Sequence, residues 1–178
     1  MYMSTTAKPE FDLPVEVRDV LQYFYTAEVS TVGKDGTPVT WPVCVQYRED
    51  RNDFLLSTSI GYSGKIYNLR RDDRISLSYS EPTGSGLDNP PHVVVQGRAN
   101  VDEEITTDVM QYADFWVESV MGPQPASSMF SSNPLMRWYM DVYYMRVFIT
   151  VDPVRIAWWP EGDHLQPMQS IKVTSYVG

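Results

Sequence analysis

The segment STSIGYSGKIYNLRR, residues 57–71, leads from a predicted strand into a predicted helix. The run Phe54 to Ser59 is typical of a buried strand, and helical spacing begins near Ser63 and places Ile66 and Leu69 on one face. The strand therefore ends in three consecutive hydroxyl side chains, and two glycines separate them from the helix. Hydroxyl groups, glycines that let backbone approach a ligand and the free N–H groups of a helix start together form a cradle for an anion.

The same residues also have a purely structural interpretation. Ser63 would then only cap the helix, and Lys65 would be a solvated surface side chain. In the functional interpretation, Lys65 supplies a positive charge to a bound phosphate. Arg71 and the other charged residues at 70–74 are interpreted as complements to the negative end of the helix.

Outside this segment the chain is patterned mainly for β-structure. Strands are predicted at about residues 27–32, 39–47, 54–59, 74–80, 92–101, 145–151, 154–159 and 169–174. Pro42 cannot donate a ladder hydrogen bond, so the second of these strands should have an edge or a bulge at that position. Helices are predicted at about residues 13–24, 106–121 and 134–143.

These elements predict a mainly β protein of the α+β kind, an antiparallel barrel with flanking helices and a C-terminal helical insert. Many strands on short turns, with Gly97 inside one of them, suit a small barrel. No change of composition marks a linker, so residues 1–178 are predicted to form one domain. Residues 1–12 are expected to be a flexible N-terminal tail.

The composition excludes several classes of partner. The 178 residues include 23 Asp and Glu against 14 Lys and Arg, a net charge of −9, which argues against binding to nucleic acid or anionic membranes. No run approaches the length of a membrane-spanning helix and the N-terminus lacks a signal-peptide pattern, which predicts a soluble, cytoplasmic protein. His92 and His164 are isolated and Cys44 lies in a strand pattern, so no metal site is expected.

Three segments, taken in order, carry a resemblance to a known family. They are AEVSTVGKDGTPVTWPV (27–43), FLLSTSIGYSGKIYNLRRDDRISLSYS (54–80) and HVVVQGRANV (92–101). The chain resembles the pyridoxamine 5'-phosphate oxidase-like family over about residues 14–103. The resemblance implies a six- to seven-stranded antiparallel split β-barrel that forms a homodimer. It also implies FMN, or the deazaflavin coenzyme F-420, in a groove between the subunits.

The resemblance also implies which residues hold the cofactor. The strand end at 57–59 and the start of the following helix would bind its phosphate, and Lys65 stands at the position of a recurrent phosphate contact. Asn68 matches a position used in deazaflavin-binding relatives, and the backbone of the segment at 40–45 would run beside the ring system. The implied cofactor-binding residues are Thr40, Trp41, Pro42, Val43, Ser57, Thr58, Ser59, Ser63, Gly64, Lys65 and Asn68.

The chain departs from the family at several basic positions. Thr40 and Val45 stand where the oxidase proper has basic residues, and Ser63 or Gly64 stands where many relatives have a second cation beside the lysine. Two or three phosphate charges are thus missing from these positions, which argues against oxidation of pyridoxine itself.

The function that follows is a flavin- or deazaflavin-dependent oxidoreductase, which transfers hydride between FMN or the deazaflavin and a small organic substrate. The cofactor carries the chemistry in such sites, so no catalytic residue is assigned. The missing charges leave two alternatives open. One is a non-catalytic protein that binds or stores flavin, and the other is a cofactor-free, dimeric split-barrel interaction module.

Overall fold

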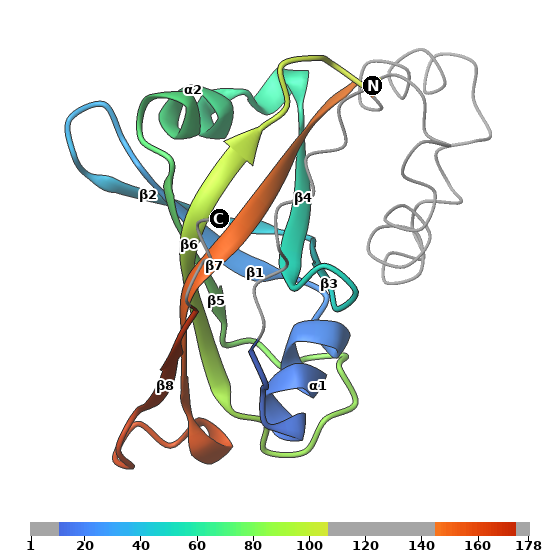
Figure 1. Cartoon of the computed structure of the whole chain (residues 1–178), viewed down its shortest axis with the longest axis vertical. Helices are drawn as coiled ribbons and strands as arrows, with labels where there is room; N and C mark the ends of the chain where they lie inside the picture. Colours follow the sequence, from blue (N-terminus) through green and yellow to red (C-terminus); the bar gives the residue numbers. More distant parts are fainter. Residues whose placement is uncertain (1–10, 107–144, 174–178) are drawn as a thin grey trace.

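The computed structural model describes residues 11–106 and 145–173, and Figure 1 shows their arrangement. The predicted helices at 106–121 and 134–143, apart from Thr106, and most of the N-terminal tail lie outside the described residues. The elements in chain order are α1 (Val15–Tyr23), β1 (Ala27–Val32), β2 (Pro38–Val43), β3 (Val45–Arg48), β4 (Asp53–Ser59), η1 (Ile60–Tyr62), α2 (Gly64–Arg71), β5 (Arg74–Tyr79), β6 (His92–Val101), β7 (Arg146–Trp159), η5 (Pro160–Gly162) and β8 (Gln169–Lys172).

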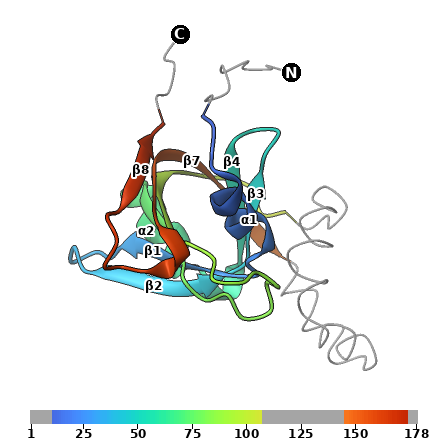
Figure 2. The same ribbon diagram turned by 90° about the horizontal axis from the view of Figure 1, so that it is seen from below.

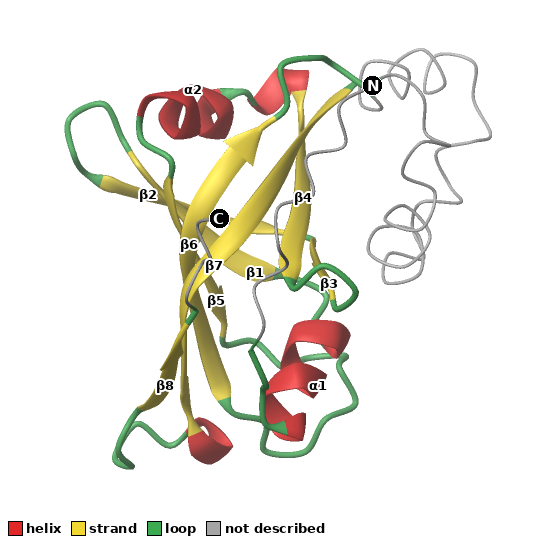
Figure 3. Ribbon diagram, in the orientation of Figure 1, coloured by secondary structure: helices red, strands yellow, loops and turns green. Residues whose placement is uncertain are grey.

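All eight strands belong to one antiparallel sheet that curls into a half-barrel. The order is β2-β1-β5-β6-β7-β4-β3, and β8 pairs with β7 outside this path. Viewed along the barrel, the strands surround an interior, and Figure 3 shows α1 and α2 near opposite ends of it (Figures 2 and 3). The mainly β, antiparallel split-barrel fold expected from the sequence is therefore confirmed.

The buried face of each element follows the alternation read from the sequence. In β1, β5 and β6 successive residues alternate between buried and less buried positions, whereas every residue of β4 is buried. The first helix begins two residues later than its earliest predicted residue and buries Val17, Val20 and Leu21 against the barrel. The described helices include none that is long and apolar enough to cross a membrane.

The predicted strand at 39–47 is in fact two strands. The chain leaves the sheet at Cys44, and the two halves pair at opposite edges, β2 with β1 and β3 with β4. Pro42 lies in β2, which is an edge strand of the sheet, so its missing N–H costs no inner ladder bond. The edge expected at this proline is confirmed, but continuous pairing through residue 44 is wrong because each half has a different partner.

The two strands predicted at 145–151 and 154–159 are in fact one. β7 runs through Asp152 and Pro153, which pair with Arg98 and Gly97. Gln96 pairs with Arg155, so Val154 is an extra residue and forms a bulge. Gly97 makes this close approach possible. A Cβ on Gly97 would stand 2.6 Å from the Asp152 carbonyl oxygen.

Candidate functional site

The polar end of β4 is buried in the protein. Ser57, Thr58 and Ser59 are 5%, 3% and 6% exposed, between the neighbouring strands β3 and β7. The Ser59 hydroxyl accepts a hydrogen bond from the Gly61 N–H at 3.4 Å and so caps the turn η1. Because a buried hydroxyl needs a partner, three of them at one strand end make a polar region inside an otherwise apolar barrel.

Lys65, in the first turn of α2, is buried rather than solvated. Its side chain is only 8% exposed, and burial followed by the nearby charge of Arg146 lowers the pKa of its ammonium. Ser63 precedes the helix, but its side chain makes no capping hydrogen bond. The purely structural interpretation, a capping serine beside a surface lysine, is therefore wrong.

Arg146, the first residue of β7, is a second buried cation at this place. It is 8% exposed, and it stands opposite Ser59 in the pairing of β7 with β4. Its guanidinium donates a hydrogen bond to the Ser57 hydroxyl at 3.2 Å. No carboxylate of the described residues forms an ion pair with Lys65. We call Ser57, Thr58, Ser59, Lys65 and Arg146 the cradle.

Trp41 brings strand β2 to the cradle. The Lys65 ammonium lies 5.0 Å from the centre of the Trp41 ring, a cation–π contact. Trp41 Cζ2 also lies 4.0 Å from the point where a Cβ on Gly64 would stand. Three of the residues expected from the sequence to share a site, on β2 and at the start of α2, are thus in contact.

The other expected residues of β2 have different surroundings. Thr40 and Pro42 are exposed, and the Thr40 hydroxyl hydrogen-bonds that of Ser30 across the sheet at 2.8 Å. Val43 packs against the apolar core. Cofactor contact by the backbone of these three residues stays a prediction.

Asn68 connects α2 to β1. Its amide nitrogen donates to the Thr31 hydroxyl at 3.0 Å, and its amide oxygen accepts from Arg71 at 3.2 Å. Arg71 also donates to the Val32 carbonyl at 2.6 Å, so its charge is used at the end of the helix, as the sequence suggested. Both ends of the Asn68 amide are engaged within the chain, and its role in binding a cofactor stays a prediction.

Cys44 lies between β2 and β3 and is half-buried. Burial raises the pKa of its thiol, and the opposing effect of Arg146 is smaller. A thiol with a raised pKa is a poor nucleophile, so Cys44 has the properties of a packing residue. Within residues 11–106 and 145–173, no three His, Cys, Asp or Glu side chains are grouped so as to hold a metal ion.

No family model matches the sequence, and no curated protein matches it either. Solved structures do match. A protein related to general stress protein 26, of the pyridoxinephosphate oxidase family, from Clostridium acetobutylicum is 13% identical over 89% of this chain and 92% of that one, with a TM-score of 0.58. General stress protein 26 from Bacillus anthracis is 15% identical over 89% and 97%, with a TM-score of 0.56.

A third match is a pyridoxamine 5'-phosphate oxidase-related, FMN binding protein from Nostoc punctiforme. It is 11% identical over 92% of this chain and all of that one (100%), with a TM-score of 0.52. The chain has the fold of the pyridoxamine 5'-phosphate oxidase-like split barrels. The resemblance seen in the sequence is confirmed at the level of the fold.

Arg146 is the one member of the cradle that the sequence analysis missed. It lies 89 residues from Ser57 in the chain. The direct pairing of β4 with β7 brings the two residues together. The available signal was a cation at the head of the apolar run Val147–Ile149, where a buried charge requires a reason. In this structure it supplies a positive charge that the positions beside Lys65 lack.

Proposed function

We propose that this chain binds FMN, with the phosphate in the cradle, and acts as a flavin-dependent oxidoreductase on a small organic substrate. The observation that carries the proposal is the pair of buried cations, Lys65 and Arg146, at the hydroxyl-rich end of β4. The match to a solved protein described as FMN binding supports it.

Two cations buried together destabilise the ligand-free site. Each loses solvation on burial, and burial, followed by the nearby charge of Arg146, lowers the pKa of Lys65. An anion between them offsets both effects. The Ser57 hydroxyl, which accepts from Arg146, keeps its own O–H as a neutral hydrogen-bond donor for one of the remaining oxygens.

The charge of the cradle favours FMN over the deazaflavin. FMN ends in a phosphate monoester, which carries close to two negative charges above its second pKa of about 6. The phosphate of the deazaflavin coenzyme is a diester with a single charge. Two buried cations are matched by the dianion, so the monoester is the better ligand.

FMN, when bound, supplies a ring that accepts or donates hydride. The residues of this chain would hold the FMN in position. Lys65 and Arg146 hold the phosphate end, and the ring of Trp41 covers the ammonium of Lys65 and limits its contact with water. We therefore assign binding and orientation to these residues and no proton transfer to any of them.

The proposal is tested by titrating the purified protein with three ligands and following flavin fluorescence. We expect FMN to bind, riboflavin to bind at least about tenfold more weakly, because it lacks a charge-assisted contact of about 1.5–3 kcal/mol, and the deazaflavin coenzyme to lie between them. Equal affinity for FMN and riboflavin would contradict the phosphate cradle. FMN binding without reduction or oxidation of the flavin by any nicotinamide or small organic substrate would identify the storage function instead.

The affinity for FMN should depend on pH through Lys65. Its pKa is lowered in the ligand-free protein, and a bound phosphate favours the charged ammonium, so binding takes up a proton. Affinity is therefore highest below the lowered pKa and falls as the pH rises through it. Titrations from about pH 7 to pH 10 measure this, a range above the second phosphate pKa. Lys65→Arg, which stays charged, should flatten the profile, and a flat wild-type profile would remove Lys65 from the site.

The proposal includes a homodimer. Trp41, which contacts the cradle, lies on β2, one of the open edges of the half-barrel, so a second subunit beside this edge would cover the open side of the cofactor site. Sedimentation at micromolar concentration should give twice the 20.4 kDa mass of one chain. A monomer under these conditions, with FMN affinity unchanged on dilution, would contradict a shared site.

A further inference from the structure

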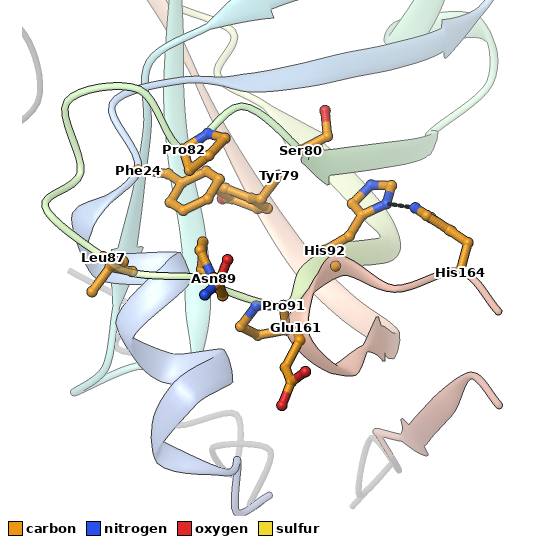
Figure 4. A pocket seen from close by; sticks show the side chains of 12 residues that line it. Phe24, Tyr79, Ser80, Pro82, Leu87, Asn89, Pro91, His92, Glu161 and His164 are labelled. Atoms are coloured by element: carbon orange, nitrogen blue, oxygen red, sulfur yellow. Dashed lines mark hydrogen bonds between the residues drawn. The ribbon is translucent and has the colours of Figure 1, made fainter. Parts of the chain in front are cut away.

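The two histidines of this chain lie side by side, although 72 residues separate them in the sequence. His92 begins β6, and His164 lies in the connection from η5 to β8. Their ring nitrogens, His92 Nδ1 and His164 Nε2, are 3.0 Å apart, which is a hydrogen-bond distance (Figure 4). We call these two residues the histidine pair. Their contact joins the segment 160–168, which connects β7 to β8, to the start of β6.

Neutral groups hold both imidazole rings of the pair in place. Trp159, the last residue of β7, stacks on His92 with 5.4 Å between the ring centres and 29° between the planes. The Trp159 ring also lies 4.9 Å from the ring of His164. The second nitrogen of His92, Nε2, is 3.0 Å from the hydroxyl of Ser78 on β5. The pair is therefore an ordered contact between β5, β6, β7 and the segment 160–168.

The histidine pair forms part of the lining of a pocket of about 390 Å³. This pocket opens between the loop that joins β5 to β6 and the turn η5, and Figure 4 shows the pair at one side of it. The loop and the turn approach closely, since a Cβ on Gly162 would stand 3.4 Å from the Pro90 carbonyl oxygen. The hydrogen bond of the pair thus connects the two sides of the pocket.

The protonation of the pair determines whether this hydrogen bond can form. A neutral imidazole has one N–H donor and one nitrogen that accepts, whereas a protonated imidazole has an N–H on both nitrogens. With no added proton, or with one, a ring that accepts is still present, and the bond persists. With a proton on each ring, two N–H groups and two positive charges face each other at 3.0 Å. The second proton therefore breaks the contact.

The charged groups around the pair set the pH at which this occurs. Burial, and then the neighbouring His164, lower the pKa of His92, and Glu28 on β1 opposes them in part. Glu161 and Asp163 are the carboxylates of the segment 160–168, and Glu161 is exposed. The lining of the pocket includes no Lys or Arg.

The sign of the pH dependence follows from the lowered pKa of His92. The closed contact disfavours the charged ring, so the closed form binds protons less readily than the open form. Closure is therefore most stable above about pH 6.5, the ordinary pKa of a histidine, and loses stability as the pH falls below it.

We propose that the histidine pair is a pH-sensitive latch, which holds the segment 160–168 against the start of β6 and releases it when both rings are protonated. Release opens the pocket between the β5–β6 loop and η5. Figure 1 shows α2, which carries Lys65, at one end of the barrel and the β8 region at the other. The latch is separate from the cradle and does not depend on the proposed flavin.

The latch is tested by NMR on untagged protein labelled with nitrogen-15 at histidine. Because the chain has two histidines, each imidazole is observed separately and its protonation is read directly. In the wild type we expect a hydrogen-bonded pair at about pH 8 and two protonated rings without this bond at about pH 5.

Amide hydrogen exchange measures the release of the segment 160–168. The amides of Asp163 and Gln166 are hydrogen-bonded within it, to the carbonyls of Pro160 and Asp163. Their protection, corrected for the pH dependence of free amides, should fall about two- to tenfold between the two pH values, the factor that corresponds to one hydrogen bond.

Three variants separate the latch from the general effects of acid. The side-chain amide introduced by His164→Gln still hydrogen-bonds but carries no charge, so the segment should keep its protection at the lower pH. In this variant the pKa of His92 should rise, because a neighbouring positive charge is gone. Glu28→Gln should act in the opposite direction and move release to lower pH, because the Glu28 carboxylate favours the charged form of His92. Asp88→Asn, at an exposed carboxylate outside the pocket lining, should leave the release pH unchanged.

The proposal is overturned if the segment loses its protection to the same extent in the wild type and in His164→Gln. It is also overturned if the wild-type rings remain hydrogen-bonded once both are protonated, or if the pKa of His92 is the same in these two proteins. The FMN affinity of His164→Gln at neutral pH should equal that of the wild type, since neither histidine belongs to the cradle. A failure of the latch is thus distinguishable from a failure of the cradle.

Discussion

Arg146→Gln is expected to lower the affinity of this protein for FMN by about 10- to 150-fold. The guanidinium is one of two buried cations of the cradle, and a hydrogen bond to a charged group contributes about 1.5–3 kcal/mol. Lys65→Ala should cause a loss of similar size, because it removes the other cation. Neither change should unfold the protein: Arg146 keeps its backbone pairing with β4, and α2 keeps Ile66 and Leu69 as its buried face.

Two arginines of this chain serve as matched controls. Arg155 lies on the same strand as Arg146 but contacts Ser170 and Met168, and Arg71 contacts the Val32 carbonyl at the end of α2. Their changes to Gln should leave the FMN affinity within about twofold of the wild type, the scale expected for surface charges. Riboflavin affinity should be unchanged in Arg146→Gln. If Arg146→Gln bound FMN as tightly as the wild type, the phosphate would lie elsewhere.

Gly97→Ala should lower the free energy of unfolding by about 1–3 kcal/mol, the usual cost of forcing a methyl group into a packed site. The added Cβ would stand 2.6 Å from the Asp152 carbonyl oxygen and 2.8 Å from Val151 Cγ1. The first of these is backbone inside the bulge of β7, so it cannot rotate away. The loss of glycine's extra freedom in the unfolded chain stabilises by about 0.4–1 kcal/mol, which is too little to offset the clash.

Urea unfolding followed by circular dichroism measures this change. Gly61→Ala is the matched control, since the atom nearest to its added Cβ is the Ser59 hydroxyl oxygen at 3.9 Å, an ordinary contact. It should change the free energy of unfolding by no more than about 0.5 kcal/mol. Equal stability of Gly97→Ala and the wild type would show that β6 and β7 can separate at the bulge without cost.

The pairing of the strands was less predictable than their presence. Alternation of apolar residues located most of the described strands, because one side of each faces the core, and β4, which is buried throughout, was located as a buried run. It gave the wrong number of strands twice. The chain breaks at Cys44 because its two halves pair with different partners, and it continues through Asp152 and Pro153 because Gly97 on the neighbouring strand accommodates the bulge. Where the strand ends and where it continues both depend on pairing with strands that are distant in the sequence.

The sequence likewise predicted some residues of the cradle and missed another. Ser57, Thr58, Ser59 and Lys65 are close in the chain, and a strand end followed by a helix start predicts an anion site there from sequence alone. The burial of Lys65 was not predictable, because a lysine in the first turn of a short helix is normally solvated. Arg146 joins them only through the pairing of β4 with β7.

The sequence by itself therefore determined the β-rich fold and the local half of the proposed phosphate cradle, because side-chain periodicity and helix-start chemistry act over a few residues. Only the tertiary structure decided which charges meet. It placed Arg146 beside Ser57 and Lys65, and Trp41 over the ammonium of Lys65. The reason is physical: the energy of a buried charge depends on its nearest charges and on the water it has lost, and both are set by contacts between distant segments.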